Sequence, residues 1–144
     1  MWTFSFWHSR LGMPKHDRAW HLQDQADELQ EWREASGLAA AWSELSDVVY
    51  TTTRAWWSGH RDIAFPFGFL RFFLGAAYMF PKYSLRWMFF RRVVADMGET
   101  IDIREVRNPR KVEKLRGLAE RYRLDPDAFV AACRRRLRWW PLLP

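Results

Sequence analysis

The chain is almost without cysteine, because only one of its 144 residues, Cys133, carries a thiol. A disulfide within the chain is therefore excluded, and so is a metal cluster held by several thiolates. Cys133 follows two alanines and precedes an arginine, with no base beside it in the sequence. We interpret it as a packed thiol rather than a nucleophile. A lone thiol is typical of a reducing compartment, and we expect a cytoplasmic protein.

The sequence also lacks a typical secretory signal and a typical membrane span. Its first ten residues, MWTFSFWHSR, have no basic residue ahead of the short apolar run, whereas a signal peptide does. The apolar run 63–80 is close to the shortest length that spans a bilayer, but Arg71 lies within it and Pro66 near its start. These two residues favour a buried or interfacial helix. Peripheral association with a membrane surface stays open.

Segments that alternate as strands are absent too, so we expect an all-α fold. Capping residues, glycines and prolines mark the helix ends. The expected helices cover residues 17–36, 38–57, 68–80 and 84–97, and two more begin at Asn108-Pro109 and Asp125-Pro126. The expected architecture is an antiparallel helical hairpin core within a four-to-six-helix bundle. Chain length predicts one domain, 1–144, with the hairpin at 17–57 and basic helices at 108–140.

Charge is distributed unevenly between the two halves of the chain. Residues 1–81 hold 7 basic and 9 acidic residues, whereas residues 82–144 hold 16 and 8. This asymmetry suits a site where a metal and cations share an anionic ligand, and it also suits nucleic acid or anionic lipid. The basic run 134–138 precedes two tryptophans, which suits a membrane surface, although a solvated helix end is the simpler interpretation. No known nucleic-acid motif is present, so nucleic acid is not among the expected partners.

Four carboxylates fall on one face of the expected hairpin: Glu28, Glu31, Glu44 and Asp47. At 100° per residue, a three-residue spacing keeps each pair within one helical stripe. If the chain turns midway between residues 37 and 38, Glu31 and Glu44 lie at equal height. Glu28 and Asp47 then form a second level pair, one helical turn away.

Carboxylates gathered on a semi-buried face repel one another, and a cation relieves that repulsion. Ligands that offer only oxygen favour hard ions, so we expect Mg²⁺, with Mn²⁺ as an alternative. The competing interpretation is four ordinary surface acids. It is disfavoured because the residues four positions after Glu28, Glu31 and Glu44 are Trp, Ala and Val, rather than the lysine or arginine of a helix ion pair.

The segment 27–31 (DELQE), followed after twelve residues by 44–47 (ELSD) and then by VVY, resembles a known family motif. It is similar to the EExxE…ExxD motif of the MazG-like all-α nucleoside triphosphate pyrophosphohydrolases. The resemblance covers about residues 17–57, and the first position is Asp27 where the family prefers glutamate. It implies that the four carboxylates bind Mg²⁺ and that one of them orients or deprotonates the attacking water. It also implies cleavage between the α and β phosphates, and a dimer or tetramer.

The resemblance does not supply the residues that bind the substrate. We expect Lys82 and Arg86, four residues apart on or just before the helix at 84–97, to contact the phosphates of a small-molecule substrate, with the Tyr83 hydroxyl beside them. A solvated basic face is the alternative interpretation.

Two further functions stay open at this stage. The aromatic-rich segment 62–90 could enclose the apolar part of a diphosphate, so that the same metal site serves another reaction. The chain could also be a helical scaffold, or a membrane-associated binding protein, that keeps the carboxylates only as a metal staple or binds no metal.

Overall fold

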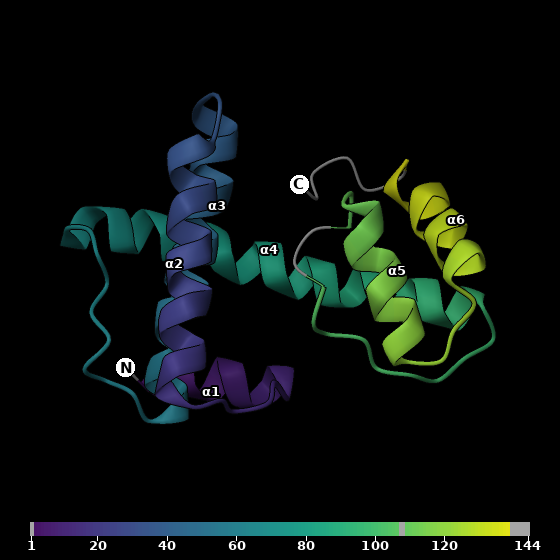
Figure 1. Ribbon diagram of the computed structural model, residues 1–144, viewed down its shortest axis with the longest axis horizontal. Coiled ribbons are helices and arrows are strands. Elements are labelled where there is room, and N and C mark those ends of the chain that lie inside the picture. The colour runs from purple at the N-terminus through teal and green to yellow at the C-terminus, as the bar shows by residue number, and fades with distance from the viewer. Residues whose placement is uncertain (1, 107–108, 139–144) are drawn as a thin grey trace. The chain divides into compact units, whose positions relative to one another are not determined.

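The computed structural model describes residues 2–106 and 109–138 (Figure 1). This part of the chain forms six helices and no strand, which confirms the expected all-α class. It divides into two compact units, Met1–Pro81 and Lys82–Pro144, called here the N-terminal and C-terminal units. The single domain expected from chain length stays a prediction, and each unit is described by itself.

The N-terminal unit contains the expected hairpin, formed by α2 (Arg18–Glu34) and α3 (Leu38–Ser58), which pack side by side (Figure 1). Asp17 caps α2, since its carboxylate accepts a hydrogen bond of 2.8 Å from the Trp20 backbone N–H. Gly37 and Gly59 have φ angles of +87° and +110°, which glycine adopts without strain, and they stand at the turn and at the end of α3. Local sequence therefore sets the hairpin ends within two residues of expectation.

Helix α3 is the centre of this unit, because nearly every residue from 43 to 55 is buried. Its three consecutive threonines, Thr51, Thr52 and Thr53, donate their hydroxyl protons to carbonyls of their own helix, which satisfies these groups away from water. Helix α1 (Trp2–Leu11) packs on α3 and places His8 against Thr53, with 2.9 Å between Nε2 and Oγ1. No helix was expected over residues 2–11.

The two helices expected at 68–80 and 84–97 form a single helix, α4 (Phe69–Asp96), so the expected break at Pro81 was wrong. A proline inside a helix removes one hydrogen bond and crowds the preceding turn. Pro81 is exposed, so water can solvate the carbonyl that loses its partner. The buried face continues past it at helical spacing, through positions 76, 79, 83, 86, 90 and 93. Continuous burial on that face outweighs the local cost of the proline.

Helices α3 and α4 approach closely at Gly75. A Cβ atom there would lie 2.6 Å from Val49 Cγ2 and 3.3 Å from both Cγ and the carbonyl oxygen of Leu45. We therefore expect Gly75→Ala to lower the free energy of unfolding by about 1–3 kcal/mol, through overpacking. The measurement is urea denaturation.

The matched control for this substitution is Gly117→Ala, because a Cβ atom at that helical glycine would meet no atom within 4 Å. Its expected effect is a gain of about 0.5–1 kcal/mol from helix propensity. Adding Val49→Ala to Gly75→Ala is expected to recover part of the lost stability. Equal gains from both glycine substitutions would contradict the close approach.

The C-terminal unit has a core built by three helices. Phe89, Phe90 and Val93 of α4 pack with residues of α5 (Val112–Arg121) and α6 (Pro126–Leu137). Asp125 caps α6 as expected, with 2.6 Å between its Oδ1 and the Ala128 backbone nitrogen. Helix α5 begins at Val112 rather than at the expected Pro109, and Asn108 lies outside the described residues. In the described part of the chain, no helix has the length and apolarity needed to cross a bilayer.

Candidate metal centre

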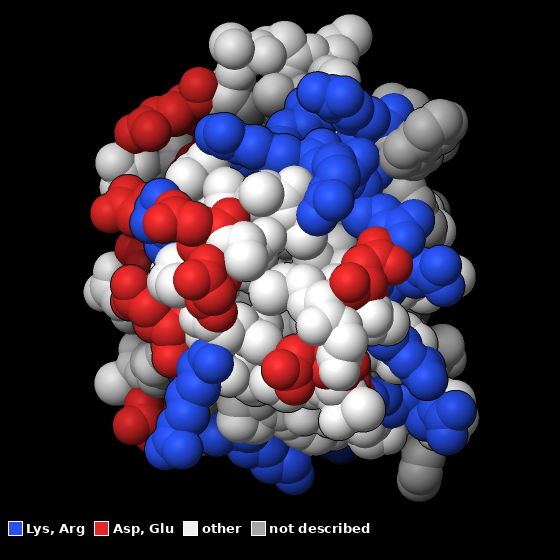
Figure 2. All heavy atoms as spheres, turned by 90° about the vertical axis from the view of Figure 1, so that its right-hand side faces the viewer, with Lys and Arg blue, Asp and Glu red and all other residues white. Residues whose placement is uncertain are grey.

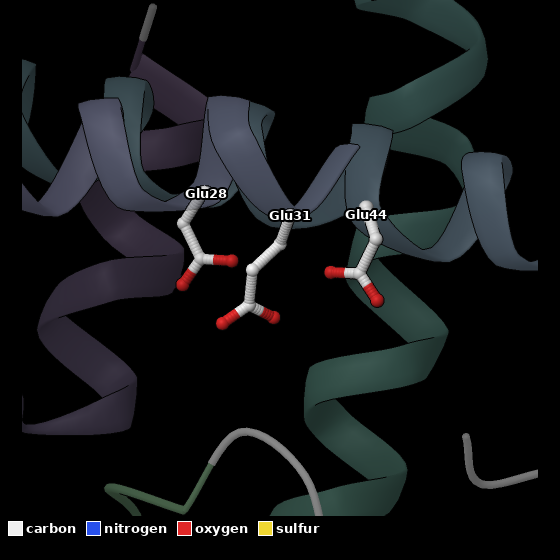
Figure 3. A group of neighbouring side chains, drawn as sticks. All are labelled: Glu28, Glu31 and Glu44. Carbon is white, nitrogen blue, oxygen red and sulfur yellow. The ribbon is translucent and has the colours of Figure 1, made fainter. Parts of the chain in front are cut away.

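Three glutamates converge on one side of the α2–α3 hairpin. Glu28 and Glu31 come from α2 and Glu44 from α3, and each offers a carboxylate oxygen within 4.8 Å of the other two (Figure 3). The three-residue spacing on α2 places its two acids on one face, and the short turn at Gly37 brings Glu44 level with Glu31. The structure thus joins three of the four carboxylates that the sequence had selected.

This group suits a small divalent cation. Two oxygens that coordinate Mg²⁺ at 2.0–2.1 Å in octahedral geometry lie about 3–4 Å apart, which the mutual limit of 4.8 Å allows. Glu28 is only 5% exposed, and Glu31 and Glu44 are half-buried. The donor set contains neither nitrogen nor sulfur, so Mg²⁺ or Mn²⁺ fits it better than Zn²⁺.

Asp47, the fourth expected ligand, lies on α3 nearly one turn after Glu44 and is 5% exposed. It is not one of the three residues whose oxygens meet the mutual 4.8 Å limit. The expected level pair of Glu28 with Asp47 is therefore not part of this group, and a ligand role for Asp47 stays a prediction.

The expected phosphate-binding residues Lys82, Tyr83 and Arg86 lie together on α4, in the C-terminal unit. All three are buried, so the alternative of a solvated basic face does not describe them. The Arg86 guanidinium lies 5.2 Å from the centre of the Tyr83 ring, and Lys82 Nζ lies 6.0 Å from it. Their contact with a substrate phosphate stays a prediction.

An aromatic wall, formed by Trp32 and Phe67, begins next to the glutamates. Trp32 follows Glu31 in α2, and its ring lies 4.6 Å from that of Phe67. The Arg71 guanidinium lies 5.3 Å from the Phe67 ring and 5.8 Å from the Trp32 ring. Phe67 also lines a cavity of about 460 Å³, whose other lining residues are Phe4, Trp56, Phe65, Phe69, Phe72 and Phe73.

Sequence reasoning missed the role of Arg71 beside this wall. The available signal was that Arg71 is the single cation of the apolar run 63–80. From the sequence, the charge of Arg71 counted only as evidence against a membrane span. The neighbouring residues do not show which aromatic rings the Arg71 side chain contacts.

A histidine cluster, also missed, lies elsewhere in the N-terminal unit. The His21 ring is fully buried, 5.5 Å from the His60 ring and 6.1 Å from the His16 ring. Burial and the Arg54 charge, in that order, lower the pKa of His21 to about 4, with smaller contributions from His60 and His16. Burial and the same arginine lower the pKa of His8 to about 3. These residues are distant in sequence, so no local pattern could have joined them.

No family model matches the chain, and no curated protein and no solved structure is similar enough to count as a match. The resemblance to MazG-like enzymes therefore rests on the hairpin sequence and the all-α fold with its group of three glutamates.

Proposed function

We propose that the N-terminal unit is a Mg²⁺-dependent pyrophosphohydrolase of the MazG-like kind. Its substrate is a nucleoside triphosphate or a related diphosphate, and a triphosphate is cleaved between the α and β phosphates. The observation that supports the proposal most is the convergence of Glu28, Glu31 and Glu44 on one side of a helical hairpin. Family resemblance over residues 27–47 supplies the reaction type.

The carboxylates share two tasks in this reaction. Glu28, Glu31 and Glu44 would hold the cation, with Asp47 as a further ligand, and Mg²⁺ or Mn²⁺ bound there would polarise the phosphoryl oxygens and lower the pKa of water. One carboxylate oxygen accepts the proton of the attacking water. The new bond joins that water oxygen to phosphorus, and the bridging P–O bond breaks. A nucleoside triphosphate then yields a monophosphate and pyrophosphate.

A second substrate class, diphosphates with an apolar group, is favoured by the aromatic wall and its cavity. Seven aromatic residues line about 460 Å³, a volume typical of small-molecule sites. Phe67 lines this cavity and its ring lies beside that of Trp32, which follows Glu31 in α2, and Arg71 brings a positive charge to the same two rings. A diphosphate with an apolar or aromatic group would use all three features.

The test is a metal titration combined with a substrate panel. Mg²⁺ and Mn²⁺ at millimolar concentration are expected to raise the Tm by several degrees, because an ion at ten times its Kd adds about 1.4 kcal/mol to the folded state. Pyrophosphate release from nucleoside triphosphates, and phosphate release from apolar diphosphates, identify the substrate class. An unchanged Tm would contradict the metal site, whereas stabilisation without turnover would indicate a metal staple.

We also propose that the protein is a dimer or a tetramer, as in the resembling family. The N-terminal unit exposes large apolar side chains, with Leu38, Phe69 and Leu70 each more than 70% exposed. Where such side chains form one patch, the patch marks an association surface. Peripheral attachment to a membrane is the alternative use of the same residues.

A further inference from the structure

We propose that the C-terminal unit binds double-stranded DNA through α5 and α6, which form a helix-turn-helix. This proposal does not rest on the hydrolase proposal, since every residue it uses belongs to the other unit. It departs from the expectation drawn from sequence, because the decisive features are a backbone conformation and a set of ion pairs that sequence alone does not display.

The connection between α5 and α6 is as short as the turn of this motif. Only residues 122–125 separate the two packed helices. Arg123 has a φ angle of +57°, and it is the one non-glycine residue with positive φ in the part of the chain that the structure describes. The backbone N–H groups of Arg123 and Leu124 donate to the carbonyls of Glu120 and Ala119, at 3.0 and 2.8 Å. These bonds close α5 with a Schellman motif, and Asp125 starts α6 immediately afterwards.

A third helix supports the pair, as a helix-turn-helix domain requires. Phe90 of α4 stacks on Phe129 of α6, with 6.3 Å between the ring centres. Leu115, Leu118 and Ala119 of α5 belong to the same buried cluster. The core thus fixes α6 with one face inward and the other free to meet a groove.

The outward face of α6 carries three exposed arginines, an exposed alanine and Asp127. Arg134, Arg135 and Arg138 are exposed, and they line a groove of about 390 Å³ together with Arg116 of α5. Figure 2 shows Lys and Arg side chains gathered over part of one face of the molecule. Ala131, which is exposed, also lines this groove, so no bulky side chain keeps the helix from entering a DNA major groove at that point.

Ion pairs engage several other arginines of the unit. Arg136 on the neighbouring side of α6 bonds to Asp96, with 2.5 and 2.6 Å between nitrogen and oxygen. Arg116 pairs with Asp127, and Arg121 with Glu105. By contrast, Arg134, Arg135 and Arg138 form no ion pair with any described residue. Three unpaired guanidinium groups on one helix face suit a row of phosphates.

An anionic membrane would need a different surface. Lipid-binding helices combine basic residues with exposed Trp, Phe or Leu that enter the acyl region. Among the described residues of the C-terminal unit, Met88 of α4 is the one exposed large apolar side chain, and α5 and α6 have none. The described part of this face therefore offers charge without exposed apolar side chains, and Trp139 and Trp140 lie outside the described residues.

The experiment is fluorescence anisotropy with a labelled DNA duplex of mixed sequence and the full-length protein. If three arginines each neutralise one phosphate, the affinity falls about 40-fold between 50 and 200 mM salt. Replacing all three arginines by glutamine is expected to weaken binding at least 10-fold at 50 mM salt. The matched control replaces Arg10, Arg33 and Arg61, exposed arginines of the N-terminal unit, and so removes the same charge.

A second variant, Ala131→Trp, separates shape from charge. It leaves the net charge unchanged and lies at an exposed position, so the fold is retained, and it is expected to weaken DNA binding at least fivefold. Circular dichroism verifies folding of each variant. Equal loss of affinity in both triple variants would overturn the proposal. Binding to phosphatidylserine vesicles without binding to DNA would overturn it too, and would identify a lipid surface instead.

Discussion

Glutamine in place of Glu28, Glu31 or Glu44 is expected to lower Mg²⁺-dependent turnover by about 100-fold or more, and to remove most of the rise in Tm that Mg²⁺ produces. Each substitution keeps the side-chain shape but takes one negative charge from three oxygens that lie within 4.8 Å of one another. A hard cation depends on that charge, and the activated water depends on the cation. Steady-state kinetics and thermal denaturation with and without Mg²⁺ measure the two effects.

Glu34→Gln is the matched control, since Glu34 belongs to the same helix, is exposed, and bonds to Gln30 at 2.9 Å rather than to the glutamate group. It is expected to keep the wild-type response to Mg²⁺. Asp47→Asn decides whether the fourth carboxylate is a ligand, as the sequence predicted. A metal response equal to that of Glu34→Gln in all three glutamate variants would contradict the site.

Lowering the pH from 7 to 5 is expected to destabilise the protein by several kcal/mol through His8 and His21. Burial and the nearby Arg54 lower their pKa values from 6.5 to about 3 and about 4. Below pH 6.5 the unfolded chain therefore binds protons that the folded protein does not bind. The free energy of unfolding therefore rises with pH in this window. The contribution of the two histidines is fully present above pH 6.5 and is lost as the pH falls towards 4.

For His8 alone, the loss at pH 5 relative to pH 7 is about 2 kcal/mol, and His21 adds to it with the same sign. Both side chains are fully buried. Urea denaturation at several pH values provides the measurement. His8→Gln keeps a partner for Thr53, and His21→Phe fills the same space without a titrating group. The double variant His8→Gln/His21→Phe is expected to lose less stability than the wild type as the pH falls. If its free energy of unfolding falls as steeply, other groups cause the pH dependence.

Much of the fold could be predicted because local chemistry sets the helix ends. Asp17 and Asp125 cap their helices as expected, and Gly59 ends α3. The prediction failed at Pro81, where a buried face that continues through α4 outweighs the local preference for a break. Such burial depends on residues distant in the chain, and no local pattern reports it.

The candidate site was also predicted only in part, for the same physical reason. Glu28, Glu31 and Glu44 were found because helical spacing and a short turn determine where their Cα atoms lie. Asp47 did not join them, because the closeness of carboxylate oxygens also depends on how two helices cross and on side-chain rotamers. Arg71 and the histidine cluster could not be predicted, since the path of residues 59–68 decides what they contact.

The lone thiol makes the protein a reporter of its own local unfolding. Cys133 lies in the core of the C-terminal unit with no exposed surface, and burial raises its pKa to about 12. A thiol reagent therefore reacts only with molecules whose C-terminal unit has opened, at a rate proportional to the population of the open state. Because the chain has no second thiol, labelling kinetics read the opening of this unit without any engineered probe.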